Sequence, residues 1–278
     1  MAVYSAEHYL NRKRLPHLWC AGCGSGIVLG SLTRAMAALG LDREKVVTVT
    51  GIGCWGKADD YLNTNAFHGT HGRALSFATG IKAANPELTV IALMGDGDGA
   101  TIGGNHLIHS ARRNIGVTAI VVNNMNYGMT GGQYSATTPH GCITSTSKYG
   151  NPEREMDLCA LVAVAGANYV GRSTAYHVTQ LDSLIKNAIS HKGFSFVEVI
   201  SPCPTHFGRR NKFGVSVGMM KCLKERGLNK AKFGMLAEEE KDKYILLGKL
   251  VDRDEPDFNE QYETIRTRVF GSEQGLKG

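Results

Sequence analysis

One stretch of the sequence, Thr89 to Asn114, decides the fold, and it reads TVIALMGDGDGATIGGNHLIHSARRN. Its first six residues, 89–94, are β-branched or apolar and predict a strand that is buried on both faces. A glycine-rich turn follows at 95–104, and residues 105–114 have the apolar spacing of a helix. Strand, turn and helix in this order predict one unit of a parallel α/β sheet.

Similar strands and helices alternate along the rest of the chain. Further strands are expected at 45–50, 117–122 and 194–200, and further helices at 27–39, 74–85 and 179–193. This alternation predicts an α/β fold, a mainly parallel sheet with helices on both faces, joined by right-handed crossovers. We assign residues 1–212 to this domain and residues 213–278 to a charged C-terminal extension, helical or irregular, without a strong strand pattern.

Composition excludes several classes of function. The chain has 278 residues, 42% of them hydrophobic, which is enough for a sizeable core, and its net charge of +6 is scattered rather than gathered into a nucleic-acid-binding stripe. No stretch approaches the ~20 apolar residues of a membrane span, and the N-terminus lacks the apolar segment of a secretion signal. The seven cysteines are an odd number. We therefore expect a cytoplasmic protein that uses cysteine for metal or redox chemistry, not for disulfides.

The unusual loops all follow predicted strands. They are GIGCWGK at 51–57, GDGDGATIGG at 95–104, NNMNYGMTGGQ at 123–133 and SPCPTHFGRRN at 201–211. Ligands of parallel α/β sheets bind at the carboxyl ends of the strands, where such loops meet. The sequence therefore predicts one site at this edge of the sheet.

Two of these loops suit a magnesium ion and a phosphate. Asp96 and Asn124 offer hard oxygen ligands, and with a backbone carbonyl and two phosphate oxygens they would fill most of an octahedral shell. The glycines allow close approach of the backbone to a phosphate at a helix N-terminus, although alone they also fit a plain tight turn. The paired GDG and NN motifs resemble the diphosphate-binding motif of thiamine diphosphate enzymes. That resemblance implies Asp96, Asn124 and the Asn126 carbonyl as the Mg²⁺ ligands.

Four cysteines are expected at the same edge. Cys54 and Cys203 follow strands, and Cys20 and Cys23 precede the first helix, whose N-terminus lies at the carboxyl end of the sheet. Four such thiolates bind either zinc or an iron–sulfur cluster, and their spacing does not separate the two. A thioredoxin-like dithiol is less consistent, because it leaves Cys54 and Cys203 unused.

Six motifs together resemble one family. WCAGCG, GIGCWGK, HGTHGRAL, GDGDG, NNMNYGMTGGQ and SPCPT occur in the order typical of the β subunit of 2-oxoacid:ferredoxin oxidoreductases, over residues 15–210. The resemblance implies a [4Fe-4S] cluster on Cys20, Cys23, Cys54 and Cys203, beside thiamine diphosphate and Mg²⁺. It also implies oxidative decarboxylation of a 2-oxo acid to its coenzyme A thioester, with electrons passing to ferredoxin, in either direction.

The substrate and the metal retain alternatives. The motifs most resemble the 2-oxoglutarate members (2-oxoglutarate synthases), which form succinyl-CoA, with pyruvate or branched-chain 2-oxo acids as alternatives. A non-redox thiamine diphosphate decarboxylase or synthase subunit with a structural zinc on the same cysteines is a second interpretation. A non-catalytic metal-binding module is a third, and it leaves the GDGDG and NN pair unexplained.

The resemblance also assigns individual residues. Lys57 matches a contact to the substrate carboxylate, although a lone lysine is more often a solvated surface residue. His71 matches a histidine near the cofactor, and His68 is its competitor; either is equally consistent with a structural histidine. The implied cofactor contacts are Ile52, Gly53, Cys54, Trp55, His71, Gly97, Asp98, Gly128 and Met129, with Thr130 and Gln133 as neighbours. Trp55 replaces a residue that is commonly small in the family. The remaining cysteines (142, 159 and 222) and His106 and His109 are assigned structural roles.

The resemblance implies a partner as well. Thiamine enzymes activate the cofactor with a glutamate from a second domain, and no second set of strand–helix units follows residue 210. The chain is therefore expected to be inactive alone and to pair with an α subunit that supplies this glutamate. Additional ferredoxin-like subunits are compatible with this assembly.

Overall fold

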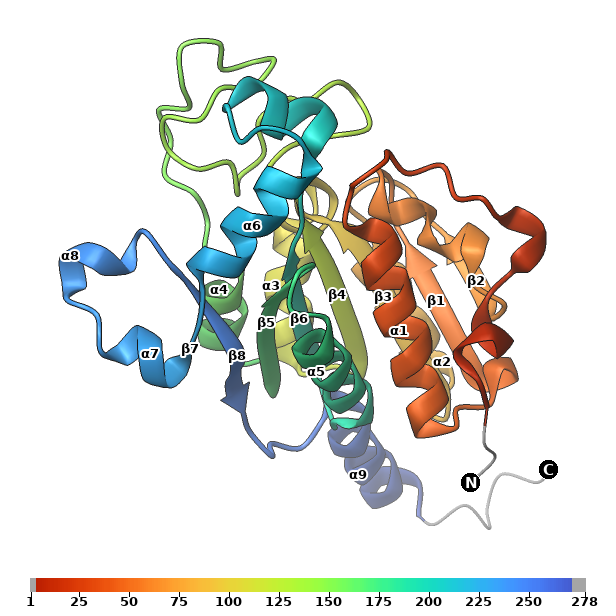
Figure 1. Cartoon of the computed structure of the whole chain (residues 1–278). Helices are drawn as coiled ribbons and strands as arrows, with labels where there is room; N and C mark the ends of the chain where they lie inside the picture. Colours follow the sequence, from red (N-terminus) through yellow and green to blue (C-terminus); the bar gives the residue numbers. More distant parts are fainter. Residues whose placement is uncertain (1–3, 272–278) are drawn as a thin grey trace.

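The computed structural model describes residues 4–271 and contains an eight-stranded sheet with the order β2-β1-β3-β4-β6-β5-β8-β7 (Figure 1). The strands are β1 Val46–Thr50, β2 Asn65–His68, β3 Thr89–Gly95, β4 Val117–Asn123, β5 Tyr169–Thr174, β6 Ser195–Ile200, β7 Gly227–Asn229 and β8 Ile245–Asp252. The first six strands in this order are parallel to one another. The expected α/β class is confirmed.

Helices cover both faces of the sheet. They are α1 Ser25–Leu39, α2 Ala74–Ala84, α3 Gly104–Arg113, α4 Leu158–Ala165, α5 Val178–Ser190, α6 Ser216–Arg226, α7 Lys230–Gly234, α8 Glu238–Lys241 and α9 Phe258–Phe270. On one face α1 and α5 pack on side chains such as Leu93 and Val197. On the other face α2, α3 and α4 pack on Ala92 and Phe196. Successive strand residues thus enter opposite cores, because side chains alternate across a strand.

Two parallel strands escape the sequence pattern. The four predicted strands match β1, β3, β4 and β6 to within one residue at each end. β2 is short, and its side chains are exposed, so it lacks an apolar signal. β5 contains Gly171 and Arg172, and a buried arginine within a strand breaks the apolar run that predicts such strands.

The C-terminal segment differs from its expectation. The sequence predicts a helical or irregular extension after residue 213, whereas β8 pairs antiparallel with β5 and β7 pairs parallel with β8. The prediction is therefore wrong for these two strands. Of the β8 side chains only Leu247 is fully buried, and charged segments flank the strand, so its pattern is that of a half-solvated edge.

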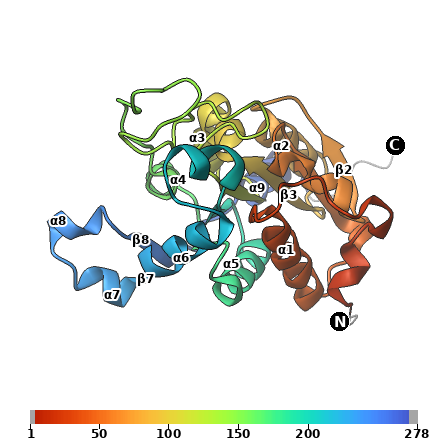
Figure 2. The same ribbon diagram turned by 45° about the horizontal axis from the view of Figure 1, so that its top comes forward.

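The carboxyl ends of β1, β3, β4 and β6 lie at one edge of the sheet, at the top of Figure 1. Figure 2, with this edge turned forward, shows the start of α1, the long loop that follows β4, and α6 gathered around it. The segments singled out by the sequence thus meet at one end of the molecule.

Candidate functional site

The Asp96 carboxylate lies at the carboxyl end of β3, and its side chain is fully buried. It accepts hydrogen bonds from the hydroxyls of Ser135 (2.6 Å) and Thr137 (2.7 Å) and from the backbone N–H of Asn124 (3.3 Å). Burial raises the pKa of Asp96, and these hydrogen bonds oppose the rise. A buried carboxylate held by three donors is a rigid oxygen ligand.

Three oxygen-bearing groups converge beside it. One end of the Asn124 carboxamide lies 3.3 Å from Asp96 Oδ1 and 2.6 Å from the Asn126 carbonyl oxygen. With nitrogen at this end the amide donates to both groups, and with oxygen there three acceptors face one another, as they do around a cation. Neighbouring oxygens on an octahedral Mg²⁺ lie about 2.9 Å apart, given bonds of about 2.1 Å. The two spacings bracket that value, so these residues fit the ion.

Asp98 ties three loops together. Its Oδ1 accepts from the His71 ring (2.7 Å), from the Gly72 N–H (2.7 Å) and from the Ile52 N–H (3.2 Å). Its Oδ2 is buried and has no hydrogen-bond partner among the described residues. Burial raises the pKa of Asp98, while Gly72, Ile52 and His71 lower it. The unpartnered oxygen marks a polar group that lacks a donor in the protein alone.

The two candidate histidines have different surroundings. His68 Nδ1 lies 3.0 Å from Asp59 Oδ2 and 2.8 Å from the Thr50 hydroxyl. The His71 ring is hydrogen-bonded to Asp98, and its centroid lies 5.9 Å from that of the Tyr127 ring. The geometry therefore favours His71 as the histidine that faces a bound cofactor.

The glycine-rich turn is closed by an aromatic ring. A β-carbon at Gly97 would lie only 2.4 Å from the Tyr127 ring, and the Tyr127 hydroxyl donates to the Gly97 carbonyl (3.2 Å). This contact joins the loops that follow β3 and β4. Gly128 lies near Cys54, because its β-carbon would be 3.5 Å from Cys54 Sγ, and Met129 is half-exposed beside it.

Cys20, Cys23 and Cys203 lie near enough to Cys54 to act on it electrostatically. Cys20 is exposed, and Cys23, Cys54 and Cys203 are half-buried and free. Burial, and then the charges of Cys23, Cys203 and Cys20, raise the pKa of Cys54 to about 12. Cys203 Sγ also lies 3.8 Å from Asn126 Oδ1, which places the sulfur group directly beside the candidate magnesium turn.

The sulfur spacing is wider than a single zinc ion requires. Tetrahedral Zn–S bonds of about 2.3 Å place the sulfurs about 3.8 Å apart. Among the residues that the structure describes, no three of the cysteine sulfurs lie mutually within 4.8 Å.

Lys57 and Trp55 follow Cys54 in the chain. Lys57 is partly exposed and forms an ion pair with Asp60 (3.3 Å). Trp55 lies in the core against Trp19, whose indole N–H donates to the Cys54 carbonyl (2.5 Å). The Trp55 side chain thus supports the cysteine loop from inside, and only its backbone is left to face a cofactor.

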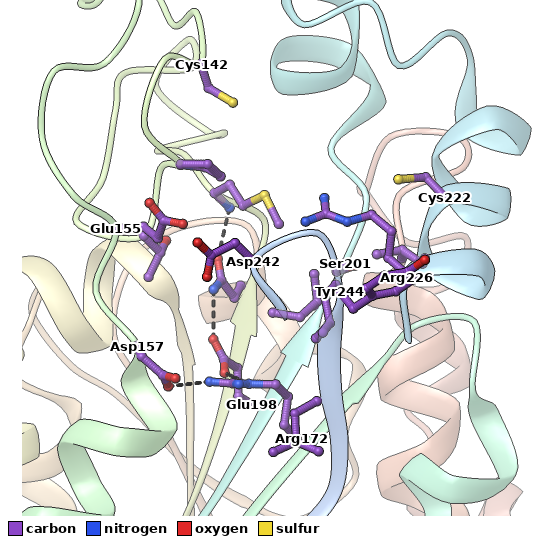
Figure 3. Close-up of a pocket in the computed structure, with 18 of the residues that line it drawn as sticks. Cys142, Glu155, Asp157, Arg172, Glu198, Ser201, Cys222, Arg226, Asp242 and Tyr244 are labelled. Atoms are coloured by element: carbon purple, nitrogen blue, oxygen red, sulfur yellow. Dashed lines mark hydrogen bonds and ion pairs between the residues drawn. The ribbon is translucent and has the colours of Figure 1, made fainter. Parts of the chain in front are cut away.

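Several neighbouring residues carried little sequence signal. Ser135 and Thr137 belong to the long loop after β4, and polar residues in such loops are common without any role. Glu198 and Arg172 form a buried ion pair behind the Asn123–Asn126 turn. Cys159 lies in the core, while Cys142 and Cys222 line a cavity of about 850 Å³ next to this ion pair (Figure 3). No helix in residues 4–271 is both long and apolar enough to cross a membrane.

Comparisons with known proteins show which proteins this chain is similar to. Residues 51–199 match the family "Thiamine pyrophosphate enzyme, C-terminal TPP binding domain". The 2-oxoglutarate synthase subunit KorB of Methanothermobacter thermautotrophicus is 49% identical over 91% of this chain and 88% of its own length. That of Methanocaldococcus jannaschii is 46% identical over 95% and 97%. A solved 2-oxoglutarate:ferredoxin oxidoreductase from Magnetococcus marinus, with 2-oxoglutarate, coenzyme A and succinyl-CoA bound, matches with a TM-score of 0.88 and 32% identity, covering 100% of this chain and 94% of that one.

Proposed function

The chain belongs to the thiamine pyrophosphate enzymes, and within them to the β subunits of the 2-oxoacid:ferredoxin oxidoreductases, and from this we propose its reaction. It is the CoA-dependent oxidative decarboxylation of 2-oxoglutarate to succinyl-CoA, with electrons passing to ferredoxin, and the same site serves the reverse direction. The observation that carries the proposal is the contact between two groups of ligands, because Cys203 Sγ lies 3.8 Å from Asn126 Oδ1.

Three groups are proposed to bind at this edge. Asp96, Asn124 and the Asn126 carbonyl hold Mg²⁺, since their oxygens have the spacing of an octahedral shell. The diphosphate of thiamine diphosphate lies against the turn that begins at Gly97, and the cofactor when bound supplies the carbanion chemistry of decarboxylation. The four cysteines hold a [4Fe-4S] cluster, which supplies one-electron transfer. No three of the four sulfurs among the described residues lie mutually within 4.8 Å, whereas a tetrahedral zinc site holds them about 3.8 Å apart, and this supports the cluster over a structural zinc.

The surrounding residues orient the cofactor and the substrate. Asp98 fixes His71 and the backbone of Gly72 and Ile52, so that these groups face the cofactor from one side. Gly53, the Trp55 backbone, Gly128 and Met129 complete the contacts. Lys57 is proposed to bind the substrate carboxylate, for which it must leave its ion pair with Asp60. That pair is partly exposed and therefore weak, so an anionic substrate can displace Asp60.

Ferredoxin is proposed to dock where the cysteine loop reaches the surface. A groove beside Ala21 is lined by Arg209 and Lys212, and no carboxylate is among the described residues that line it. Leu18 and Val215, which are 79% and 74% exposed, flank the loop and the groove. A cationic groove flanked by exposed apolar side chains, next to the exposed Cys20, suits an acidic electron carrier.

A separate α subunit is proposed to supply the activating glutamate and the rest of the substrate pocket. The seven cysteines are free, which supports a reducing compartment such as the cytoplasm. The test is to purify the chain with its partner subunit under anaerobic conditions and to measure CoA-dependent ferredoxin reduction with 2-oxoglutarate, pyruvate and a branched-chain 2-oxo acid. The proposal expects the highest kcat/KM with 2-oxoglutarate. A different preferred acid contradicts the substrate, and an absence of turnover with all three contradicts the reaction.

A further inference from the structure

A buried series of hydrogen bonds, called here the hydrogen-bond chain, runs from β5 to the candidate magnesium turn, along the floor of the cavity in Figure 3. The Arg172 Nε donates to Glu198 Oε2 (2.6 Å), and Glu198 Oε1 accepts from Asn123 Nδ2 (2.8 Å). The Asn123 Oδ1 in turn accepts from the Met125 N–H (3.1 Å). Each link uses a different atom, so the chain fixes the orientation of every side chain in it.

The two charged side chains of the hydrogen-bond chain are almost completely buried. The side chains of Arg172 and Glu198 are 12% and 3% exposed. Asp157, Cys159 and Glu198 are close enough to one another to hold a metal ion, but the Arg172 guanidinium is the cation between the two carboxylates. Burial lowers the pKa of Arg172, and the charges around it raise that pKa by more, so the net shift is upward and the group stays charged. Buried charges of this kind are costly unless paired, so separating Arg172 from Glu198 would be strongly unfavourable.

The hydrogen-bond chain ends at the turn after β4, whose backbone conformation has to be stabilised by neighbouring groups. Met125 adopts a left-handed backbone conformation, with φ 64°, which is unfavourable for a residue other than glycine. Two contacts hold it, the bond from its N–H to Asn123 and the bond from the Thr138 hydroxyl to its carbonyl (2.7 Å). This turn directs the Asn124 side chain and the Asn126 carbonyl toward Asp96.

We propose that Glu198 and Arg172 are positioning residues for the metal-binding turn, acting through Asn123. This inference rests on the proposed function, because it assigns a role toward the Mg²⁺ and diphosphate held there. Glu198 orients the Asn123 amide so that its oxygen, rather than its nitrogen, faces the Met125 N–H. Without a carboxylate at 198 the amide loses this preference, and the oxygens of Asn124 and Asn126 are no longer held at the spacing that the ion requires.

The test uses the enzyme purified with its partner subunit and stripped of metal and thiamine diphosphate. In Glu198→Gln the amide oxygen still accepts from Arg172, which leaves the amide nitrogen facing the Asn123 nitrogen. Two donors then face each other, so the hydrogen bond to Asn123 is lost. We expect the affinity for Mn²⁺ in the presence of thiamine diphosphate, measured by electron paramagnetic resonance, to fall about 10- to 100-fold. Asp157→Asn is the matched control. It weakens the partly exposed ion pair between Arg172 and Asp157 and leaves Glu198 in place, so the affinity for Mn²⁺ should change less than about 3-fold.

A second variant separates positioning from a loss of folding. Asn123→Asp together with Glu198→Gln keeps the net charge and reverses the hydrogen bond. The amide introduced on β6 then donates to the carboxylate introduced at the end of β4, and that carboxylate still accepts from the Met125 N–H. The double variant should recover most of the Mn²⁺ affinity.

Each remaining outcome has a defined meaning. Unchanged affinity in E198Q, or a lowered melting temperature with no change in affinity, overturns the proposal, as does a double variant that binds Mn²⁺ no better than E198Q. Failure of the wild-type enzyme to bind Mn²⁺ with thiamine diphosphate instead contradicts the proposed function.

Discussion

Replacing Gly97 by alanine should force apart the loops that follow β3 and β4, which form the proposed cofactor site. The new methyl would lie 2.4 Å from the Tyr127 ring, whereas carbon atoms in contact lie about 3.5–4.0 Å apart, so the ring must move by more than about 1 Å. Overpacking of this kind costs about 1–3 kcal/mol, and loss of the bond from the Tyr127 hydroxyl to the Gly97 carbonyl costs about 1 kcal/mol more. The total is about 2–4 kcal/mol, or roughly 4–16 °C in melting temperature.

Gly95 provides the matched control two residues earlier. A β-carbon there meets no atom within 4 Å, and neither Gly95 nor Gly97 has a positive φ, so G95A tests the general effect of alanine without the contact. Thermal unfolding followed by circular dichroism, on enzyme without cofactor, should show a large loss for G97A and a change below about 1 kcal/mol for G95A. Thiamine diphosphate should also bind more weakly to G97A. Equal melting temperatures for the two variants would refute the reasoning.

Three further predictions concern the metal ligands and the surface. Asp96→Ala removes a buried carboxylate from the proposed magnesium site and should abolish retention of thiamine diphosphate on gel filtration; normal retention would exclude Asp96 as a magnesium ligand. The pKa of Cys54 is raised to about 12, so the folded apo chain holds a proton that the unfolded chain releases near pH 9; its unfolding free energy should fall as pH rises from about 9 to 12, more steeply than in C54A, and parallel curves would contradict the shift. R209E/K212E should lower the rate of ferredoxin reduction at least 10-fold at low salt and leave methyl viologen reduction and the KM for coenzyme A unchanged; an equal loss with viologen would contradict docking at this groove.

The sequence predicts the centre of the fold because its strands are apolar on both faces. Helices cover both faces of β3 and β4, so the side chains in the middle of these strands are almost all apolar and the strand pattern is clear. The positions of Asp96 and Asn124 follow from the same fact, since parallel strands end at one edge. The Met125 turn and the hydroxyls of Ser135 and Thr137 do not follow, because a long loop has no periodicity from which to read its path.

The apolar pattern of the sequence does not predict the outer strands of the sheet or the buried ion pair, for a different reason. Arg172 is a charged residue within β5, and its cost of burial is offset by Glu198 from β6, a partner 26 residues away in the chain. Pairing of that kind becomes visible only when the two strands are placed side by side. β8 is similar, because its pairing with β5 stabilises a strand whose own residues are half-exposed.

Electron transfer in the proposed reaction depends on the four cysteines holding an iron–sulfur cluster beside the proposed magnesium site. The most direct measurement is the iron, acid-labile sulfide and zinc content of the anaerobically purified complex, compared between the wild-type chain and the variant in which Cys20, Cys23, Cys54 and Cys203 are all replaced by alanine. We expect at least four irons and four sulfides per copy of this chain in the wild-type complex, and a loss of about four of each in the variant, whatever clusters the partner subunits hold. Zinc without sulfide in the wild-type chain, or iron and sulfide unchanged by the four substitutions, would contradict it.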